Sequence, residues 1–346
     1  MDHRVTEFQS LLDSNGMIAE EGWSSFPVWK YERSKIHASG WRIKEWDYYA
    51  ITDTSAGWTL CATISDLGFA ALYSVSFIDY KLAKFAQQDV MKFFTFGKTG
   101  LSATSTEDSS VCVSSAKLNI SFEKKGIYRH VVVSVPELVL PDGRKGLSAD
   151  IVLTQPEDLE SLNIATSWKE NRKAFYLNQK VNCMAASGKV CFGDSSYELP
   201  DGTVWAVLDW GRGRWTRENT WYWGSASGTV GSHSFGFNLG YGFSDRTPAS
   251  ENALFYDGKI HKLTEVEFHI PSNSFVKPWK ITSSDNRLDL DFVPAVDRYS
   301  NTDFKIIKSL QHQVFGYFSG KAVLDDGTVL EIKDLPGFAE KVYNKW

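Results

Sequence analysis

The sequence predicts an all-β protein, folded as an antiparallel sandwich or barrel with few short helices. Short apolar runs bounded by turn residues recur along most of the 346 residues. Aromatic residues, which favour strands, make up 14% of the chain. Asp-Gly pairs also recur between apolar runs, as in β-hairpins. Two units are expected at this length, although a β barrel can reach about 250 residues as one domain.

Individual runs carry the strand pattern. Residues 58–64 and 71–78 form two apolar runs separated by Asp66 and Gly68. Residues 266–270 alternate between apolar and polar side chains, which indicates a strand with one buried face. Residues 5–12 and 80–96 instead have a spacing compatible with helices, and Gly97 would end the second.

The Asp-Gly motif indicates how the chain is divided. It occurs in residues 140–143, 199–202 and 324–327, and glycine supplies the positive φ that hairpin turns need. Its spread suggests two similar β units. We expect an N-terminal arm over residues 1–40, a first barrel-like half over 41–163 and a second over 164–346, which carries the main motifs. A barrel of about eight strands can hold one small ligand.

Charge and motif content exclude several functions. The net charge is −5 with both signs mixed, so nucleic-acid binding is not expected. The chain has no apolar run long enough to span a bilayer, and its first twenty residues do not resemble a signal peptide, which favours a cytoplasmic location. No phosphate-loop motif or histidine cluster predicts a cofactor or a metal site. Oligomeric state is left open.

The four cysteines do not form a C-x-x-C pair. Cys183 and Cys191 are close enough in sequence to pair across a hairpin. Reduced thiols are the expectation for a cytosolic protein, so the disulfide is left open.

Candidate functional residues concentrate between Trp205 and Asn252. Asp209 follows an apolar strand directly, and glycines flank Arg212, which would place an acid and a base side by side. The same pair could equally close a structural bulge. Trp221 and Trp223 alternate onto one face of a strand, where they would form either the floor of a ligand site or part of the core.

The next stretch, residues 236–245, interleaves glycines with large side chains, which suggests close backbone approach. Asn238 needs hydrogen-bond partners if it faces inward. Asn238 and Asp245 are therefore candidate substrate contacts.

A possible acid–base pair completes the set. Glu251 and Asn252 precede an apolar strand, and burial beside tryptophans would raise the pKa of Glu251. With Asp209 this carboxyl could carry out proton transfer, and Asn252 could bind substrate. His312 lies between two glutamines beside a strand and is the best-placed histidine for proton transfer, although a lone histidine is more often structural.

Several of these motifs, in this order, resemble the domain of unknown function DUF2804. They are residues 209–213, 221–224, 237–240, 251–259, 277–279, 311–316, 324–327 and 337–340. The family name implies no activity. More distantly, the chain is similar to lipocalin-like proteins that include carotenoid hydratases and cyclases of isoprenoid or polyketide substrates. That similarity implies two packed β barrels with a pocket in or between them.

The leading functional hypothesis is a cofactor-independent enzyme that hydrates, eliminates, isomerises or cyclises a small molecule. Asp209 and Glu251 would exchange protons, Arg212 would stabilise charge, and Trp221 and Trp223 would stack on the substrate. A glycoside hydrolase or sugar-binding protein is an alternative, because sugars also stack on tryptophan and bind carboxylates. A non-catalytic carrier of a small ligand is another.

Overall fold

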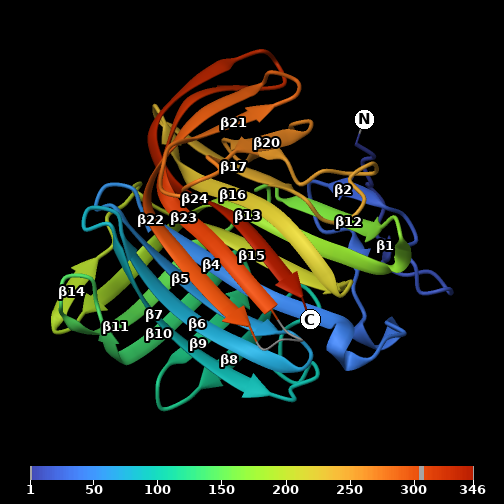
Figure 1. Cartoon of the computed structure of the whole chain (residues 1–346), viewed down its shortest axis with the longest axis horizontal. Coiled ribbons are helices and arrows are strands. Elements are labelled where there is room, and N and C mark those ends of the chain that lie inside the picture. The colour runs from blue at the N-terminus through green and yellow to red at the C-terminus, as the bar shows by residue number, and fades with distance from the viewer. Residues whose placement is uncertain (1, 304–307, 346) are drawn as a thin grey trace.

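The computed structural model describes residues 2–303 and 308–345, and nearly all of this chain is β structure (Figure 1). Two large antiparallel sheets, of 13 and 9 strands, curl toward each other. A two-stranded parallel pair, β1 (Gln9–Ser10) and β3 (Trp29–Lys30), belongs to the N-terminal arm. The expected all-β architecture of two packed halves is confirmed.

The first sheet runs in the order β7-β6-β5-β4-β15-β13-β11-β10-β9-β8, with β12 and β14 also along β13 and β2 on β12. Its strands are β2 (Gly22–Ser24), β4 (Ile43–Asp53), β5 (Trp58–Asp66), β6 (Ala70–Asp79), β7 (Lys84–Phe93), β8 (Ser109–Ser114), β9 (Asn119–Lys125), β10 (Tyr128–Val139), β11 (Lys145–Thr154), β12 (Leu162–Trp168), β13 (Asn171–Phe192), β14 (Ser195–Glu198) and β15 (Val204–Arg214).

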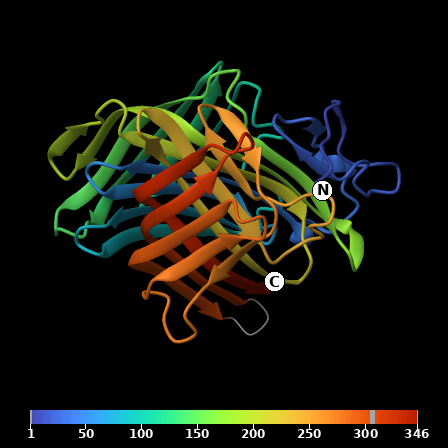
Figure 2. The ribbon, with the colours of Figure 1, turned by 90° about the horizontal axis from the view of Figure 1, so that it is seen from above.

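The second sheet runs in the order β19-β18-β17-β16-β24-β23-β22-β21-β20. It contains β16 (Glu218–Val230), β17 (His233–Tyr241), β18 (Ala253–Tyr256), β19 (Lys259–Lys262), β20 (Val266–His269), β21 (Trp279–Ser283), β22 (Leu288–Asp303), β23 (Lys308–Val323) and β24 (Val329–Lys345). Figure 2 shows the orange and red strands of this sheet lying against the blue and green strands of the first.

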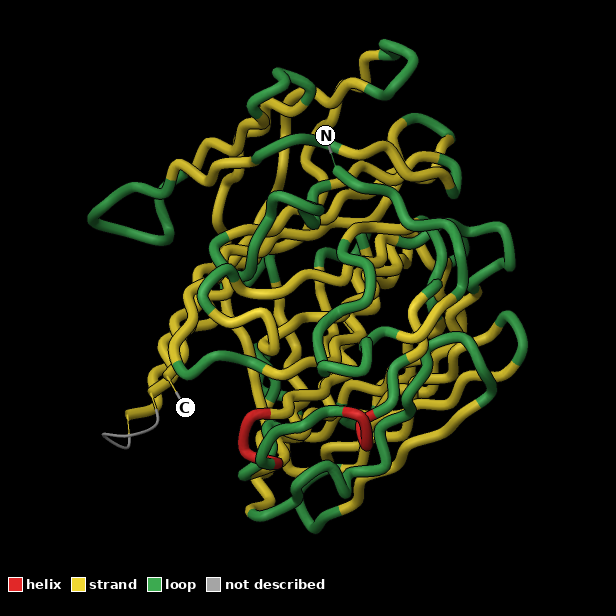
Figure 3. Tube along the Cα trace, turned by 90° about the vertical axis from the view of Figure 1, so that its right-hand side faces the viewer, coloured by secondary structure: helices red, strands yellow, loops and turns green. Residues whose placement is uncertain are grey.

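Helical structure in the described residues is limited to two short 3-10 turns, η1 (Arg33–Lys35) and η2 (Gly40–Arg42), which lie together at one end of the molecule (Figure 3). The helix expected over residues 80–96 is wrong, because most of that stretch is the strand β7. Its side chains are largely exposed at the edge of the sheet, so the two-residue burial pattern of a strand is missing. The helix expected over residues 5–12 is also wrong, since β1 lies there.

Two of the three Asp-Gly turns form the expected hairpins, between β10 and β11 and between β23 and β24. The turn at residues 199–202 does not join two paired strands. It leads from β14 to β15, and both of these strands pair with β13. The Asp-Gly sequence therefore predicted the turn correctly. The strands on either side of it do not pair with each other, because the 22-residue strand β13 is long enough to pair with both.

Three apolar layers hold the two sheets. One lies inside the first sheet and one inside the second. A third layer, here called the intersheet layer, contains aromatic side chains from both sheets, including Tyr48, Tyr176, Trp215, Trp223 and Phe338. Residues 174–184 of β13 are buried on both faces because they contribute to two of these layers.

The chain crosses from the first sheet to the second between Arg214 and Glu218. The domain division expected at residues 163 and 164 stays a prediction, because sheet membership does not test whether each part folds alone. All four cysteines are free, Cys183 and Cys191 included. No helix in the described parts of the chain is long and apolar enough to cross a membrane.

Candidate functional site

Three charged side chains meet in the intersheet layer. Lys180 on β13 and Asp209 on β15 are paired residues of neighbouring strands, and Glu251 lies on the loop before β18. Lys180 Nζ is 2.9 Å from Asp209 Oδ2 and 3.7 Å from Glu251 Oε2. All three side chains are at least nine-tenths buried. The structure thus brings Asp209 and Glu251 to the same cation, which the sequence did not identify.

The Lys180–Asp209 pair is held from two sides. Asn178, on the same face of β13, donates from Nδ2 to Asp209 Oδ1 at 2.6 Å and to the Trp210 carbonyl at 2.9 Å. The Lys180 ammonium also lies 4.0 Å from the ring centroid of Trp223, in a cation–π contact. Several partners therefore offset the desolvation of this cation.

The loop that carries Glu251 is fixed by two asparagines. Asn238 donates to the Glu251 carbonyl at 2.7 Å and accepts from Trp223 Nε1 at 2.7 Å. Asn252 accepts from the Gly240 amide at 2.8 Å. A Cβ at Gly240 would lie 2.6 Å from Glu251 Cγ, so any larger residue at this strand position would displace the Glu251 side chain.

Burial raises the pKa of Glu251 to about 7, against the opposing charge of Lys180. The negative charge of Asp209 adds to the rise. Glu251 Oε2 also has no hydrogen-bond partner among the described residues, since Lys180 is beyond hydrogen-bond distance. With a pKa near 7, the Glu251 carboxyl can be either protonated or ionised at neutral pH, and its Oε2 lies 3.7 Å from the Lys180 ammonium.

A second carboxyl of this kind lies on β24. Glu340 Oε1 accepts from Trp221 Nε1 at 2.8 Å, and burial raises the pKa of Glu340 to about 7. Burial also raises the pKa of Tyr176, and the charges of Glu251, Asp209 and Glu340 raise it further. Tyr176 therefore lies in the electrostatic field of all three carboxyl groups.

Aromatic rings surround the charged cluster. Trp223 meets Tyr48 and Phe338 edge-on, with ring centroids 5.7 and 4.7 Å apart. Trp221 meets Trp215 at 5.8 Å. The two tryptophans of β16 point to the same layer, as their alternation predicts. Burial beneath these rings removes water from the carboxyl groups, so desolvation is the largest cause of the raised pKa values of Glu251 and Glu340.

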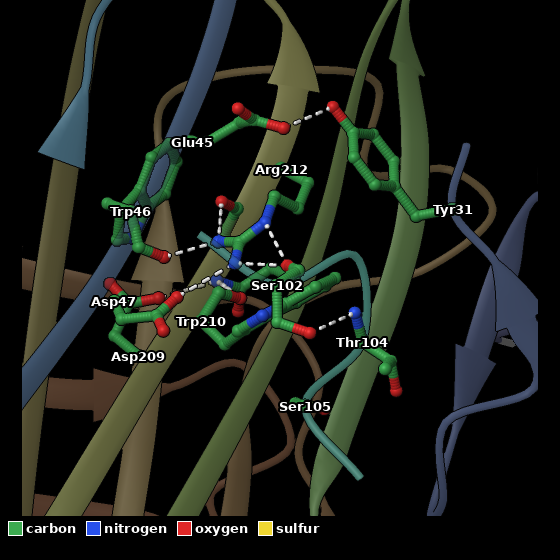
Figure 4. Close-up of polar contacts among 12 residues, drawn as sticks. Tyr31, Glu45, Trp46, Asp47, Ser102, Thr104, Ser105, Asp209, Trp210 and Arg212 are labelled. Carbon is green, nitrogen blue, oxygen red and sulfur yellow. Dashed lines mark hydrogen bonds and ion pairs between the residues drawn. The ribbon is translucent and has the colours of Figure 1, made fainter. Parts of the chain in front are cut away.

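Arg212 lies on the opposite face of β15 from Asp209, inside the first half (Figure 4). Its guanidinium is fully buried and contacts Asp47 at 3.0 Å. It also donates to the carbonyls of Trp46 and Ser102, each at 2.7 Å. Arg212 therefore fastens the chain around residue 102 to the first sheet.

His312 and Asp245 lie apart from the cluster. His312 Nδ1 is 2.8 Å from Asp297 Oδ2, and its ring stacks on Phe275 at 3.7 Å. Alternation along β23 turns His312 away from the face that carries Gln313, which pairs with Glu340. Asp245 forms an ion pair with Arg172 at 3.1 Å.

Sequence reasoning missed Lys180, Asn178, Tyr176 and Glu340. A partial signal for Lys180 and Asn178 was present, because Asn178, Lys180 and Asn182 recur at every second position, although Gln179 between them is polar as well. Such a period-two polar row in a buried strand indicates polar groups gathered on one face. Glu340 had only its place in a family motif.

Two surface pockets are present, and none of Lys180, Asp209 or Glu251 lines either of them. One of about 500 Å³ is lined by Tyr222, Tyr241 and Phe268, inside the second half. The other, of about 380 Å³, is lined by Trp23 and Lys262, among others. Lys262, on the wall of the smaller pocket, has its Nζ 3.3 Å from Oγ of Ser250, the residue before Glu251.

The described residues, 2–303 and 308–345, contain no group of three or more His, Cys, Asp or Glu side chains placed to hold a metal ion. In the cluster, the carboxyl groups of Asp209 and Glu251 lie around a lysine instead.

The family model of DUF2804, a domain of unknown function, matches residues 2–346. The chain belongs to this family. A comparison with curated proteins found no match. The crystal structure of CghA with Sch210972 matches with a TM-score of 0.55 and 9% sequence identity, over 88% of each chain. At this identity the likeness concerns the fold, and it confirms the expected lipocalin-like architecture.

Two other solved structures are similar at lower scores. A putative AttH from Nitrosomonas europaea has a TM-score of 0.48 and 10% identity, over 89% of this chain and 94% of its own. Kievitone hydratase from Nectria haematococca has a TM-score of 0.47 and 10% identity, over 88% of each chain.

Proposed function

We propose that this protein is an enzyme that catalyses hydration, elimination, isomerisation or cyclisation of a small molecule by acid–base chemistry at Asp209 and Glu251. The observation that carries the proposal is the buried Glu251 carboxyl, with a pKa of about 7 and one oxygen without a hydrogen-bond partner. Buried polar atoms are rarely left unpaired, and general acids and bases need a pKa close to the working pH. A perturbed carboxyl in a polar cluster is therefore a functional candidate.

The proposed division of labour follows the contacts of each carboxyl group. Asp209 pairs with Lys180 and would act as the base that takes a proton from substrate carbon. Glu251, protonated at and below neutral pH, would give its proton to the leaving hydroxyl, which departs as water. In hydration the same two transfers run in reverse. The Lys180 ammonium would stabilise negative charge that develops on a substrate oxygen.

The substrate class follows from the walls of the site. Trp221, Trp223 and Tyr48 present aromatic surface beside the carboxyl groups, which suits a substrate with apolar rings or chains and a few oxygens. The pocket beside Lys262 would be its route of approach. A passive carrier would have no need of a buried carboxyl with a pKa near neutral pH beside a second carboxyl, an arrangement that is costly to maintain.

The test is turnover of hydroxylated and unsaturated isoprenoid, polyketide and sugar compounds, followed by deuterium incorporation from heavy water. Asp209→Asn and Glu251→Gln should each reduce kcat by about 10²- to 10⁴-fold, the usual contribution of a general acid or base. Glu331→Gln, on a side chain that is 70% exposed, is the matched control and should keep full activity. Turnover that survives both changes would show that the assignment is wrong.

A correctly folded but inactive variant must be distinguished from an unfolded one. Near-UV circular dichroism reports the packing of the intersheet tryptophans in each variant. The pH profile of kcat/KM gives a second readout. The limb near pH 7 in the wild-type profile should be lost in a Glu251→Gln enzyme with residual activity, and should remain in the control.

A further inference from the structure

Four aromatic side chains form an exposed patch beside η2, here called the end patch: Trp41, Phe93, Phe94 and Phe96. Their exposed fractions are 51%, 58%, 69% and 37%. Neighbouring rings lie 6.0 to 6.3 Å apart, so the patch is continuous. Contiguous exposed aromatic surface of this kind marks an interaction site.

The backbone holds two of these rings outward in a strained conformation. Phe94 has φ of 60° and Phe96 has φ of 47°, a left-handed region that bulky residues rarely adopt. The Phe94 amide donates to the Phe69 carbonyl at 2.6 Å, and the Phe96 amide donates to the Gly68 carbonyl at 2.9 Å. Strained backbone that is maintained by surrounding hydrogen bonds is found most often at functional sites.

A buried acid anchors the turn behind the patch. Asp66 on β5 is fully buried, and its carboxylate accepts from the Gly68 amide at 2.9 Å and the Gly97 amide at 2.8 Å. It also accepts from Thr99 Oγ1 at 3.1 Å. The end patch is therefore a fixed surface of the fold.

Basic residues flank the end patch. Lys92 is the last residue but one of β7 and Lys98 lies on the turn after β7; both are exposed, and no ion pair among the described residues involves either of them. Arg42 adjoins Trp41 in sequence; burial and, to a smaller extent, the charge of Arg42 lower the pKa of Arg214, so these two cations are neighbours. Residues 90–100 contain no acidic residue. The patch thus combines exposed aromatic rings with unpaired positive charge.

We propose that the end patch docks on the surface of an anionic phospholipid bilayer. Tryptophan and phenylalanine side chains favour the headgroup level of a bilayer, and lysine and arginine are attracted to anionic lipids. The rings of Phe93 and Phe94 enter the interface, while Lys98 beside them and Lys92, on the other face of the β7 edge, attract lipid phosphates. Net charge does not oppose this, because the −5 total is distributed over the whole molecule and the attraction is local.

The first experiment is co-sedimentation of the full chain with phosphatidylcholine vesicles, with and without phosphatidylserine. Binding is expected only to the anionic vesicles and should weaken at high salt, since charge screening shortens the range of the attraction. Binding to neither vesicle type overturns the proposal. So does a patch that is covered in solution by a second copy of the chain, detected by sedimentation velocity as a dimer that dissociates when the patch is mutated.

Two double variants test the two parts of the patch. Phe93→Ser with Phe94→Ser should weaken vesicle binding by at least about tenfold through lost apolar insertion. Lys92→Glu with Lys98→Glu should weaken it to a similar extent, about tenfold or more, through lost attraction to anionic lipid. If neither double variant changes vesicle binding, the patch is not the docking surface.

Matched controls lie elsewhere on the molecule. Tyr128→Ser with Val276→Ser removes two exposed apolar side chains outside the patch. Lys189→Glu with Lys333→Glu makes the same change in net charge at two other exposed lysines. Both controls should bind anionic vesicles as the wild type does. Equal loss of binding in the controls would show that net charge or general hydrophobicity, and not the end patch, governs the interaction.

Discussion

At the scale of single residues, the distinctive feature is a set of buried ionisable side chains whose loss of hydration is only partly offset by ion pairs and hydrogen bonds. Lys180 is near two carboxyl groups, Asp209 and Glu251, and Glu340 lies in the same layer with an indole N–H as its donor. Buried charge is expensive because desolvation often exceeds the Coulombic gain. Because burial disfavours the ionised carboxylate, the pKa values of Glu251 and Glu340 are raised from 4.5 to about 7.

The raised pKa of Glu251 has a consequence for stability. Below pH 4.5 Glu251 is protonated in both the folded and the unfolded protein, so its ionisation does not lower the free energy of unfolding. Between pH 4.5 and about 7 only the unfolded chain releases it, and stability falls as pH rises through this window. Glu251→Gln removes this effect. The free energy of unfolding of the variant, relative to wild type, should rise by about 3 kcal/mol from pH 4.5 to pH 8.

Urea unfolding at several pH values measures this difference. The direction of the change matters more than the absolute stability, because Glu251→Gln also removes the charge opposite Lys180. Glu331→Gln, at an exposed side chain, should follow the wild-type curve at every pH. Parallel curves for wild type and Glu251→Gln would contradict the raised pKa.

At the scale of elements, single strands serve two layers at once. β15 directs Asp209 into the intersheet layer and Arg212 into the first half, although only two residues separate them. β13 does the same along its buried stretch, residues 174–184. Because side chains alternate in a strand, adjacency in sequence separates functional groups and does not gather them. For this reason Asp209 and Arg212, which the sequence suggested would lie side by side, have separate ion-pair partners: Lys180 for Asp209 and Asp47 for Arg212.

The turn after β7 gives a prediction at this scale. Asp66→Asn should weaken the acceptor that holds the Gly68 and Gly97 amides, and lower the free energy of unfolding by about 1–3 kcal/mol. Amide hydrogen exchange of residues 94–99 should accelerate more than that of β10. Asp89→Asn, at an exposed position on β7, should leave both quantities unchanged. Unaltered exchange in the Asp66 variant would show that the turn is held by other contacts.

At the scale of the whole molecule, the intersheet layer ties the two sheets into one structure. Trp223 from the second sheet contacts Tyr48 from the first and the ammonium of Lys180. Asn182 on β13 also donates to Ser225 on β16 at 2.9 Å. Separating the sheets would expose these aromatic and polar groups together, so unfolding one half removes support from the other.

Thermal unfolding should therefore follow one cooperative transition by calorimetry. Trp223→Ala should lower the stability of both sheets together by about 3–5 kcal/mol, the usual cost of removing a large buried ring. Two separate transitions in the wild type, or loss of structure in only one sheet of the variant, would show that the halves are independent domains.

The sequence by itself determined the β class, the alternating strands, two hairpins, and a set of residues of which Asp209, Glu251, Trp223 and Asn238 lie together in the structure. Those features depend on local rules, namely side-chain alternation and turn chemistry. Tertiary structure alone decided that Lys180 and Glu340 join them, that His312 does not, and that residues 84–93 form an edge strand. The reason is that alternation fixes which face a side chain takes within its own strand, whereas the pairing of distant strands and the packing of one sheet on another decide what that face meets.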